Sequence, residues 1–167
     1  MKNIFEISPE GYVIGRTGNG DQFIFDIEDF GLVANHTWGI SPAGYVVAKK
    51  MGKTIRLHRM IIKPSAGLEV DHINCIKTDN RRINLRECTR QQNNANINKS
   101  LKLKASTKYK GVSLQKSGKY RAMIGYNNER IHLGYFITAE EAAKAYNEKA
   151  IELYGEFARQ NFIPEVA

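Results

Sequence analysis

Residues 69–98 read EVDHINCIKTDNRRINLRECTRQQNNANIN. In this stretch Asp71 and His72 are adjacent, Asn84 lies twelve residues after the histidine, and Asn93 lies nine residues further on. Hydrolysis of a phosphodiester needs a base that deprotonates water and a divalent ion that neutralises the charge developing on the phosphate. A carboxylate, an imidazole and two amides at this spacing therefore indicate a phosphodiester-cleaving site.

The same stretch predicts a compact local fold. Residues 70–72 favour a strand that enters a long polar turn, and Leu85 lies on a short return strand. Thr89 is a good helix N-cap, and Gln92, three residues later, completes a capping box. These signals place Asn93 in the first turns of a helix that faces back toward the strand pair.

Each side chain suits one chemical need. Asp71 is a hard oxygen donor for Mg²⁺, with Mn²⁺ as the other candidate, and Asn93 can offer a neutral amide oxygen to the same ion. His72 is the natural base, because a neutral imidazole near pH 7 can accept a proton. Adjacent side chains of a strand point to opposite faces, so Asp71 and His72 can serve one phosphate only at the twisted end of that strand.

The string DNRRINLR at residues 79–86 extends the pattern, and with it the sequence resembles the HNH endonucleases, in the branch whose last ligand histidine is replaced by asparagine. This resemblance implies a ββα-metal fold in which Asp71 and Asn93 bind the ion. It also implies that His72 activates water and that Asn84 holds the base and the site loop in place.

Three neighbouring features bear on alternatives. Many relatives have a glycine and an asparagine in the turn where this chain has Cys75 and Ile76, which favours a relic unit that binds DNA without cutting. His58 ends a strand expected at residues 54–58, and either a structural role or a phosphate contact is expected for it. The lone Trp38 is expected to anchor the core, since a single aromatic side chain among apolar neighbours usually packs.

The positive charge of the chain is localised. The chain has 167 residues and a formal net charge of +8, enough length for one medium domain or two small ones. Ten basic residues and one acidic residue lie between Arg90 and Tyr135, so the remainder is close to −1. Such a basic footprint indicates a nucleic-acid partner rather than a general solubility device.

Composition disfavours other classes. The sequence has no run of about eighteen apolar residues and no signal-peptide pattern, so we expect a cytoplasmic protein without a membrane partner, in a phage-infected or bacterial host cell. Cys75 and Cys88 form no Cys-x-x-Cys pair, which argues against a zinc ribbon and a disulfide framework. Both are expected to be packing thiols, and zinc is not expected.

The segments before and after the site differ in pattern. Short β-like runs separated by glycine-rich turns occur at residues 12–14, 22–25 and 45–48. They predict a small antiparallel sheet ahead of the site. Residues 99–107 are polar and carry lysines, which is typical of a linker whose lysines can follow DNA phosphates.

From Lys108 onward the pattern predicts three short strands and one helix. The strands are expected at residues 109–113, 119–124 and 130–134, with the apolar side chains on one face. The helix is expected to begin at Thr138, with Glu141 as its capping-box partner, and to end at Gly155. One face of the sheet is then left for a ligand.

Four strings stand out in this region: YKGV at 109–112, LGYF at 133–136, EEAAKAY at 140–146 and GEFARQNF at 155–162. With them, residues 108–162 resemble the APETALA/ethylene-response-factor DNA-binding domain. In that family the sheet enters the major groove of duplex DNA. By position, the outward residues expected to contact DNA are Lys110, Ser113, Gln115, Lys119, Arg121, Arg130 and His132. Plant members carry arginine or tryptophan at Ser113, Gly125 and His132, so their target does not transfer.

The sequence as a whole predicts an α+β chain, with an antiparallel β region leading into a ββα-metal unit and then a three-stranded antiparallel sheet packed on one helix. The expected parts are an HNH nuclease domain at 1–98 (β-rich 1–57, ββα-metal 58–98), a linker at 99–107, an APETALA/ethylene-response-factor-like domain at 108–162 and a tail at 163–167.

The expected function is a metal-dependent DNA endonuclease of the homing type, acting on double-stranded DNA as a monomer with no protein partner. The alternative is a non-catalytic, sequence-specific DNA-binding protein or regulator with a relic HNH unit. An RNA-binding module fits less well, because no aromatic stacking pair is expected on the outward face of the sheet.

Overall fold

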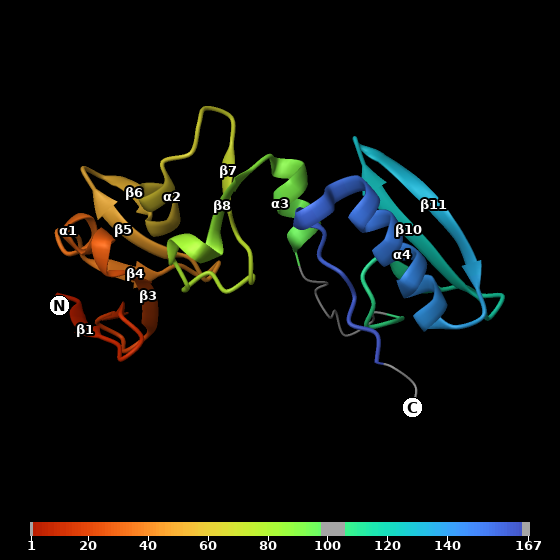
Figure 1. Cartoon of the computed structure of the whole chain (residues 1–167), viewed down its shortest axis with the longest axis horizontal. Helices are drawn as coiled ribbons and strands as arrows, with labels where there is room; N and C mark the ends of the chain where they lie inside the picture. Colours follow the sequence, from red (N-terminus) through yellow and green to blue (C-terminus); the bar gives the residue numbers. More distant parts are fainter. Residues whose placement is uncertain (1, 98–105, 165–167) are drawn as a thin grey trace. The chain divides into compact units, whose positions relative to one another are not determined.

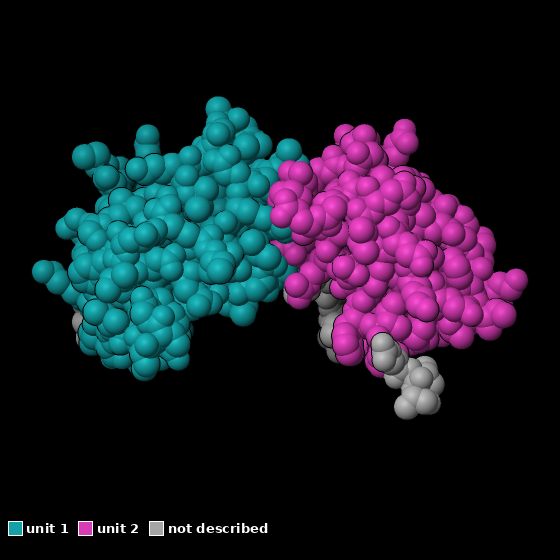
Figure 2. Space-filling model, in the orientation of Figure 1, with its two compact units in different colours: residues 1–89 teal, residues 90–167 magenta. Residues whose placement is uncertain are grey.

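The computed structural model describes residues 2–97 and 106–164 (Figure 1). Contacts divide the chain into two compact units, residues 1–89 and residues 90–167 (Figure 2). Most of the predicted linker and the end of the predicted tail lie outside the described residues. The domain boundaries expected from the sequence stay a prediction.

Short antiparallel strands build the first unit, as the sequence predicts. One sheet has the order β1-β2-β3, from β1 (Ile4–Ile7), β2 (Tyr12–Arg16) and β3 (Gln22–Asp26). A second sheet has the order β4-β5-β6, from β4 (Trp38–Ile40), β5 (Val46–Lys50) and β6 (Lys53–Arg56). Along the chain, the short helices η1 (Ile27–Asp29) and α1 (Phe30–Val33) connect β3 to β4.

The expected strand at residues 54–58 ends early. It stops at Arg56, and the helix α2 (Leu57–Ile62) begins at the next residue. The physical reason is burial, because Leu57, His58 and Ile61 are the buried residues of this segment and they follow helical rather than alternating spacing. His58 is therefore a helix residue.

A single apolar core joins these elements. Trp38 is 2 % exposed, and its indole Nε1 donates a hydrogen bond to the carbonyl oxygen of Val33 at 2.9 Å, which confirms its predicted role as a core anchor. Val70 and Leu85 belong to the same buried cluster. They come from the hairpin of β7 (Glu69–His72) and β8 (Leu85–Cys88), so the hairpin that carries the site rests on this core.

The second unit is a three-stranded antiparallel sheet packed on one long helix. The sheet has the order β11-β10-β9, from β9 (Val112–Leu114), β10 (Tyr120–Tyr126) and β11 (Glu129–Phe136). The helix α4 (Ala139–Tyr154) lies along β10 (Figure 1), and Ala122 and Ile124 of the strand are buried on this side. Two shorter helices, α3 (Arg90–Asn96) and η3 (Gly155–Phe157), complete the unit.

The predicted signals at the ends of α4 are confirmed. The Glu141 main-chain N–H donates to Thr138 Oγ1 at 3.1 Å, and the Thr138 N–H donates to Glu141 Oε2 at 3.2 Å. At the other end the helix stops at Gly155, which has a φ of 53°. Among the described residues no helix has the length and apolar character needed to cross a membrane.

Candidate active site

The predicted acid, Asp71, and the predicted base, His72, are consecutive residues of β7 and have different neighbours in the β7–β8 hairpin. Asp71 pairs across the hairpin with Arg86, and His72, the last residue of β7, pairs with Leu85. The two side chains point to opposite sides, as alternation along a strand requires. Asp71 is 5 % exposed and His72 is 4 % exposed, so both groups are nearly withdrawn from water.

Asp71 is bound by a basic side chain that the sequence reading did not single out. Arg86 donates from Nε at 3.1 Å and from Nη2 at 3.0 Å, both to Asp71 Oδ2. This ion pair supplies a counter-charge to the buried carboxylate and fixes its orientation. The signal available in the sequence was the position of Arg86 on the predicted return strand, opposite an acid.

The donor set around Asp71 suits a hard cation with few protein ligands. No group of three or more His, Cys, Asp or Glu residues in the described part of the chain could hold a metal ion. The Asp71 carboxylate is a hard oxygen donor of the kind that Mg²⁺ and Mn²⁺ accept. Asp71 therefore fits a site for Mg²⁺ or Mn²⁺.

Two aromatic rings lie close to the candidate base. The His72 ring lies 4.9 Å from the ring of His58 and 6.1 Å from the ring of Tyr45, measured between centroids. His58 is itself 2 % exposed, which supports the structural role expected for it and leaves no surface for a phosphate. The sequence does not predict the contact between His58 and His72, because α2 and β7 come together only in the folded chain.

Asn80 determines which nitrogen of His72 carries the proton. His72 Nε2 lies 3.5 Å from Asn80 Oδ1, while the amide nitrogen of Asn80 faces the carbonyl oxygen of Lys77 at 3.5 Å. The acceptor end of the amide thus faces the imidazole, and we assign the proton of neutral His72 to Nε2. The lone pair that can accept a further proton is then on Nδ1.

Burial keeps the candidate base neutral. Desolvation lowers the pKa of His72 below its ordinary value of 6.5, against the opposing effects of the Asn80 hydrogen bond and the charge of Asp71. A pKa below the ordinary value leaves the imidazole unprotonated at neutral pH. His72 is therefore in the state that a general base requires.

His58 is more strongly affected, and this predicts a pH-dependent stability. Burial, with the charge of His72 next in size, lowers the pKa of His58 to about 3. Because the unfolded chain binds the proton near pH 6.5 and the folded chain does not, stability is complete above pH 6.5 and declines as pH falls toward 3. From pH 7 to pH 5 we expect His58 to reduce the free energy of unfolding by about 2 kcal/mol.

Urea unfolding of the wild type and of His58→Phe at both pH values measures this effect. The phenylalanine ring keeps the shape and cannot be protonated, so the variant should lose about 2 kcal/mol less than the wild type on acidification. Equal losses in both proteins would show that His58 is not the responsible group.

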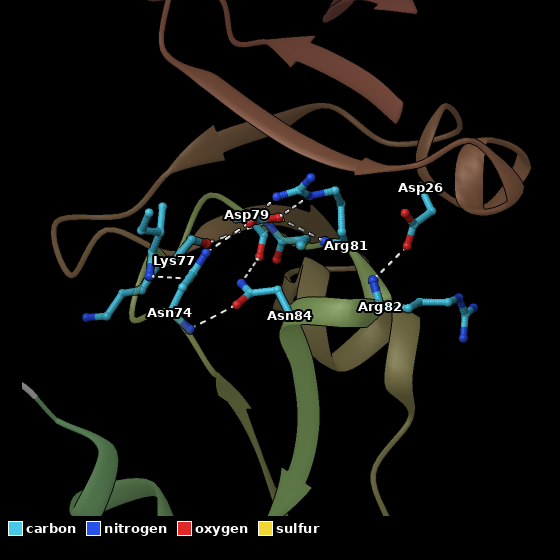
Figure 3. Close-up of polar contacts among 9 residues, drawn as sticks. Asp26, Asn74, Lys77, Asp79, Arg81, Arg82 and Asn84 are labelled. Atoms are coloured by element: carbon cyan, nitrogen blue, oxygen red, sulfur yellow. Dashed lines mark hydrogen bonds and ion pairs between the residues drawn. The ribbon is translucent and has the colours of Figure 1, made fainter. Parts of the chain in front are cut away.

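Asn84 holds the site loop rather than the imidazole. It ends the short helix η2 (Arg82–Asn84) and is 6 % exposed. Figure 3 shows its amide between Asn74 and Asp79: Oδ1 accepts from the Asn74 main-chain N–H at 2.9 Å, and Nδ2 donates to the Asp79 carbonyl oxygen at 2.8 Å. Of the two functions that the resemblance implied, the described contacts support holding the loop, whereas the hydrogen bond to the ring comes from Asn80.

The N-terminal sheet and helix η1 also hold the loop. The Arg82 main-chain N–H donates to Asp26 Oδ2 at 2.6 Å (Figure 3), and its guanidinium binds Asp29. Ile24 of β3 exchanges main-chain hydrogen bonds with Thr78 and Asn80 at 2.9 and 2.8 Å. These contacts join segments more than fifty residues apart and fix Asn80 beneath the imidazole.

The turn after His72 keeps its tight geometry without glycine. Cys75 has a φ of 64°, in the left-handed region, and its N–H donates to the His72 carbonyl oxygen at 2.8 Å. A side chain in this conformation costs about 1 kcal/mol relative to glycine. The turn that differs from the family pattern is thus strained but formed.

Asn93, the second predicted ligand, lies on α3 in the second unit. The helix begins at Arg90, as the Thr89 signal predicts. That Asn93 joins Asp71 at an ion stays a prediction.

Four of the seven residues expected to face outward lie on the sheet face away from α4. Ser113 and Arg121 are partners on β9 and β10, and Arg130 lies on β11, all on the face away from α4. His132 shares this face as the partner of Met123. Gln115 and Lys119 lie in the β9–β10 turn, where their main chains are hydrogen-bonded at 2.9 Å.

Lys110 does not lie on the outward face. It precedes β9, because the expected strand at 109–113 begins only at Val112, and its ammonium group donates to the carbonyl oxygen of Ala95 at 2.6 Å. The chain turns at Gly111, where φ is 76° and a Cβ would collide with the ring of Tyr146, so only glycine fits this position. A DNA contact by Lys110 stays a prediction.

Comparison with known proteins agrees with the hairpin geometry. The HNH endonuclease family matches residues 63–95. A protein of Acanthamoeba polyphaga mimivirus described as an uncharacterized HNH endonuclease is 34 % identical over 157 residues, which cover 90 % of this chain and 80 % of the viral protein. The chain belongs to the HNH endonuclease family, and it is therefore a nuclease.

Shorter similarities involve plant transcription factors. An APETALA2-like protein of Oryza sativa is 41 % identical over 63 residues, 36 % of this chain and 14 % of the plant protein. An ethylene-responsive transcription factor of Medicago truncatula is 47 % identical over 62 residues, 36 % of this chain and 20 % of its own length. These matches are partial.

Proposed function

We propose that this nuclease is a metal-dependent DNA endonuclease of the homing type, with His72 as the general base. The observation that carries the proposal is a buried, neutral imidazole at the end of β7, adjacent in sequence to a buried carboxylate, in a chain of the HNH family. The imidazole can accept a proton from water, and the carboxylate is a hard ligand for a cation.

Each residue of the site has one task in this mechanism. Nδ1 of His72 takes the proton of the attacking water, and Asn80 at Nε2 holds the ring in that tautomer. Asp71 and Asn93 would hold a divalent ion, Mg²⁺ first and Mn²⁺ second. When bound, that ion supplies neutralisation of the charge on the phosphate and the leaving oxygen.

The second unit supplies affinity for the duplex in this proposal. Support comes from its outward arginines, from the short matches to plant transcription factors and from the ten basic residues between Arg90 and Tyr135. Contacts with phosphates and base edges by a separate unit provide register, so the metal site need act only locally. A monomer that acts on duplex DNA in the cytoplasm remains part of the proposal.

Loss of Arg121 and Arg130 tests the role of the sheet. We expect the double substitution Arg121→Ala and Arg130→Ala to weaken DNA binding and to reduce the salt slope of log Kd by up to about two, because each phosphate contact releases about one counterion. Binding titrations in chelator between low and moderate salt measure the slope. Lys149→Ala is a matched control, since Lys149 lies on α4 and pairs with Glu152 at 2.6 Å. An unchanged slope in the double variant would remove this face from the interface.

Plasmid cleavage tests the function as a whole. Supercoiled plasmids with varied inserts are incubated with the protein and Mg²⁺, Mn²⁺ or chelator. Metal-dependent nicked or linear product is expected. Retarded but intact DNA under every condition would favour the alternative, a non-catalytic DNA-binding protein, for which the engagement of Asp71 by Arg86 and the strained turn at Cys75 are the supporting observations.

A further inference from the structure

A small aromatic patch lies on the outward face of the sheet among the cations. It consists of Met123, His132 and Tyr135, and we refer to it as the aromatic facet. Met123 and His132 are cross-strand partners on β10 and β11, and the rings of His132 and Tyr135 lie 4.8 Å apart. Tyr135 is 56 % exposed, so this ring does not serve the core. The sequence predicts no aromatic stacking pair on this face, and these two rings are tilted against each other rather than stacked.

A β-bulge brings Tyr135 to this face. The register of β10 and β11 shifts between Ala122 and Met123, so that Ala122 faces Gly134 while Met123 faces His132. Strict alternation from Ile131 and Leu133 would have directed Tyr135 toward α4. The extra residue reverses the direction of the side chains that follow, which is a known use of such bulges.

The neighbours of the aromatic facet are suited to DNA. Arg121 is the cross-strand partner of Tyr135 on one side and of Ser113 on the other. Arg121 Nε is buried and has no hydrogen-bond partner among the described residues, so the guanidinium is not used up by an internal contact at this atom. Arg130 lies further along the same face, opposite Gly125, where the strand has no side chain. An apolar spot between cations therefore faces the proposed duplex.

We propose that the aromatic facet makes the second unit select a thymine, by covering the 5-methyl group of that base in the major groove. Among the base edges in this groove, the thymine methyl is the apolar group, and apolar side chains recognise it by contact. The two rings are tilted by 55°, so they form an uneven apolar surface that suits a methyl group better than a parallel slot for a stacked base. The inference rests on the proposed DNA binding and adds a specificity determinant to it.

Uracil substitution tests the inference, because uracil lacks only the methyl group. The full chain, in chelator and at fixed salt, first selects duplexes from a random library. Each thymine of the selected site is then replaced by uracil in turn. We expect one replacement to weaken binding about fourfold, the change that corresponds to burial of one methyl group.

Variants assign the effect to the facet. Tyr135→Ala should bind thymine and uracil duplexes equally at that position, whereas Tyr135→Phe should keep the fourfold difference. Ile137→Ala is the matched control, since Ile137 is an 81 % exposed apolar residue just beyond β11 and should leave the difference unchanged. Circular dichroism and thermal melting check that each variant is folded.

The outcomes separate this inference from the proposed function. If specific duplexes are selected but no position is sensitive to uracil, thymine selection by the aromatic facet is overturned while DNA binding stands. The same holds if the sensitivity persists in Tyr135→Ala. Competition by single-stranded DNA or RNA as strong as that by duplex would assign the rings to base stacking instead and also overturn it. Failure to select any duplex overturns both the facet and DNA binding by this unit.

Discussion

Replacement of His72 by alanine should reduce the rate of DNA cleavage by a factor of about 10² to 10⁴ and so nearly abolish it, because this is the range typical of removing a general base. DNA binding should remain nearly intact, because the imidazole is 4 % exposed and the proposed contacts with the duplex come from the second unit. Cleavage rates on supercoiled plasmid with Mg²⁺ and Kd values in chelator measure the two effects separately.

His36→Ala is the control for this experiment. His36 lies in the same unit, with its ring 5.6 Å from the ring of Trp38, and has no place in the proposed chemistry. It should cleave at the wild-type rate. If His72→Ala lost binding to the same degree as cleavage, the division of tasks between the site and the second unit would be refuted.

Replacement of Asp71 by asparagine should reduce cleavage by a factor comparable to that of His72→Ala and should also weaken Mn²⁺ binding. The amide keeps the shape of the side chain but removes the charge that attracts a cation. The same change leaves the Arg86 guanidinium buried without its counter-charge, which costs about 3 kcal/mol of stability or more. Titration of Mn²⁺ by electron paramagnetic resonance and urea unfolding separate the two consequences.

A double variant distinguishes catalysis from structure at this position. Asp71→Asn combined with Arg86→Gln removes both charges, so part of the lost stability should return. Cleavage and Mn²⁺ affinity should not return, because neither new side chain is a carboxylate. Recovery of cleavage together with stability would show that Asp71 serves the fold and does not hold the ion. Asp21→Asn, an exposed carboxylate of the same unit, serves as the control.

Local signals in the sequence predicted the elements that local chemistry determines. The strand at 70–72, the return strand at Leu85 and both ends of α4 follow from alternation and capping, which involve residues close in sequence. Trp38 was assigned to the core for the same kind of reason, since apolar neighbours are visible in the sequence.

The contacts that complete the site are between distant residues, and local patterns do not contain them. His58 of α2 packs on His72 of β7. Asn80 reaches the imidazole only because main-chain hydrogen bonds to β3 hold the loop in place. Tyr135 lies just beyond the strand expected at 130–134, and a single bulge in β11 places it on the outward face. Neither a register shift nor a main-chain bond to a loop leaves a periodic trace.

The attachment of the site loop to the N-terminal sheet has a consequence for the order in which the protein becomes active. Residues 73–84 form a loop with one short helix, η2, and the loop is held by hydrogen bonds to Ile24, Asp26 and Asp29. A newly made chain therefore cannot arrange His72 and Asn80 for catalysis before the first sheet has folded. A fragment that contains the whole HNH segment but begins after β3 would carry every residue of the motif and remain a poor nuclease.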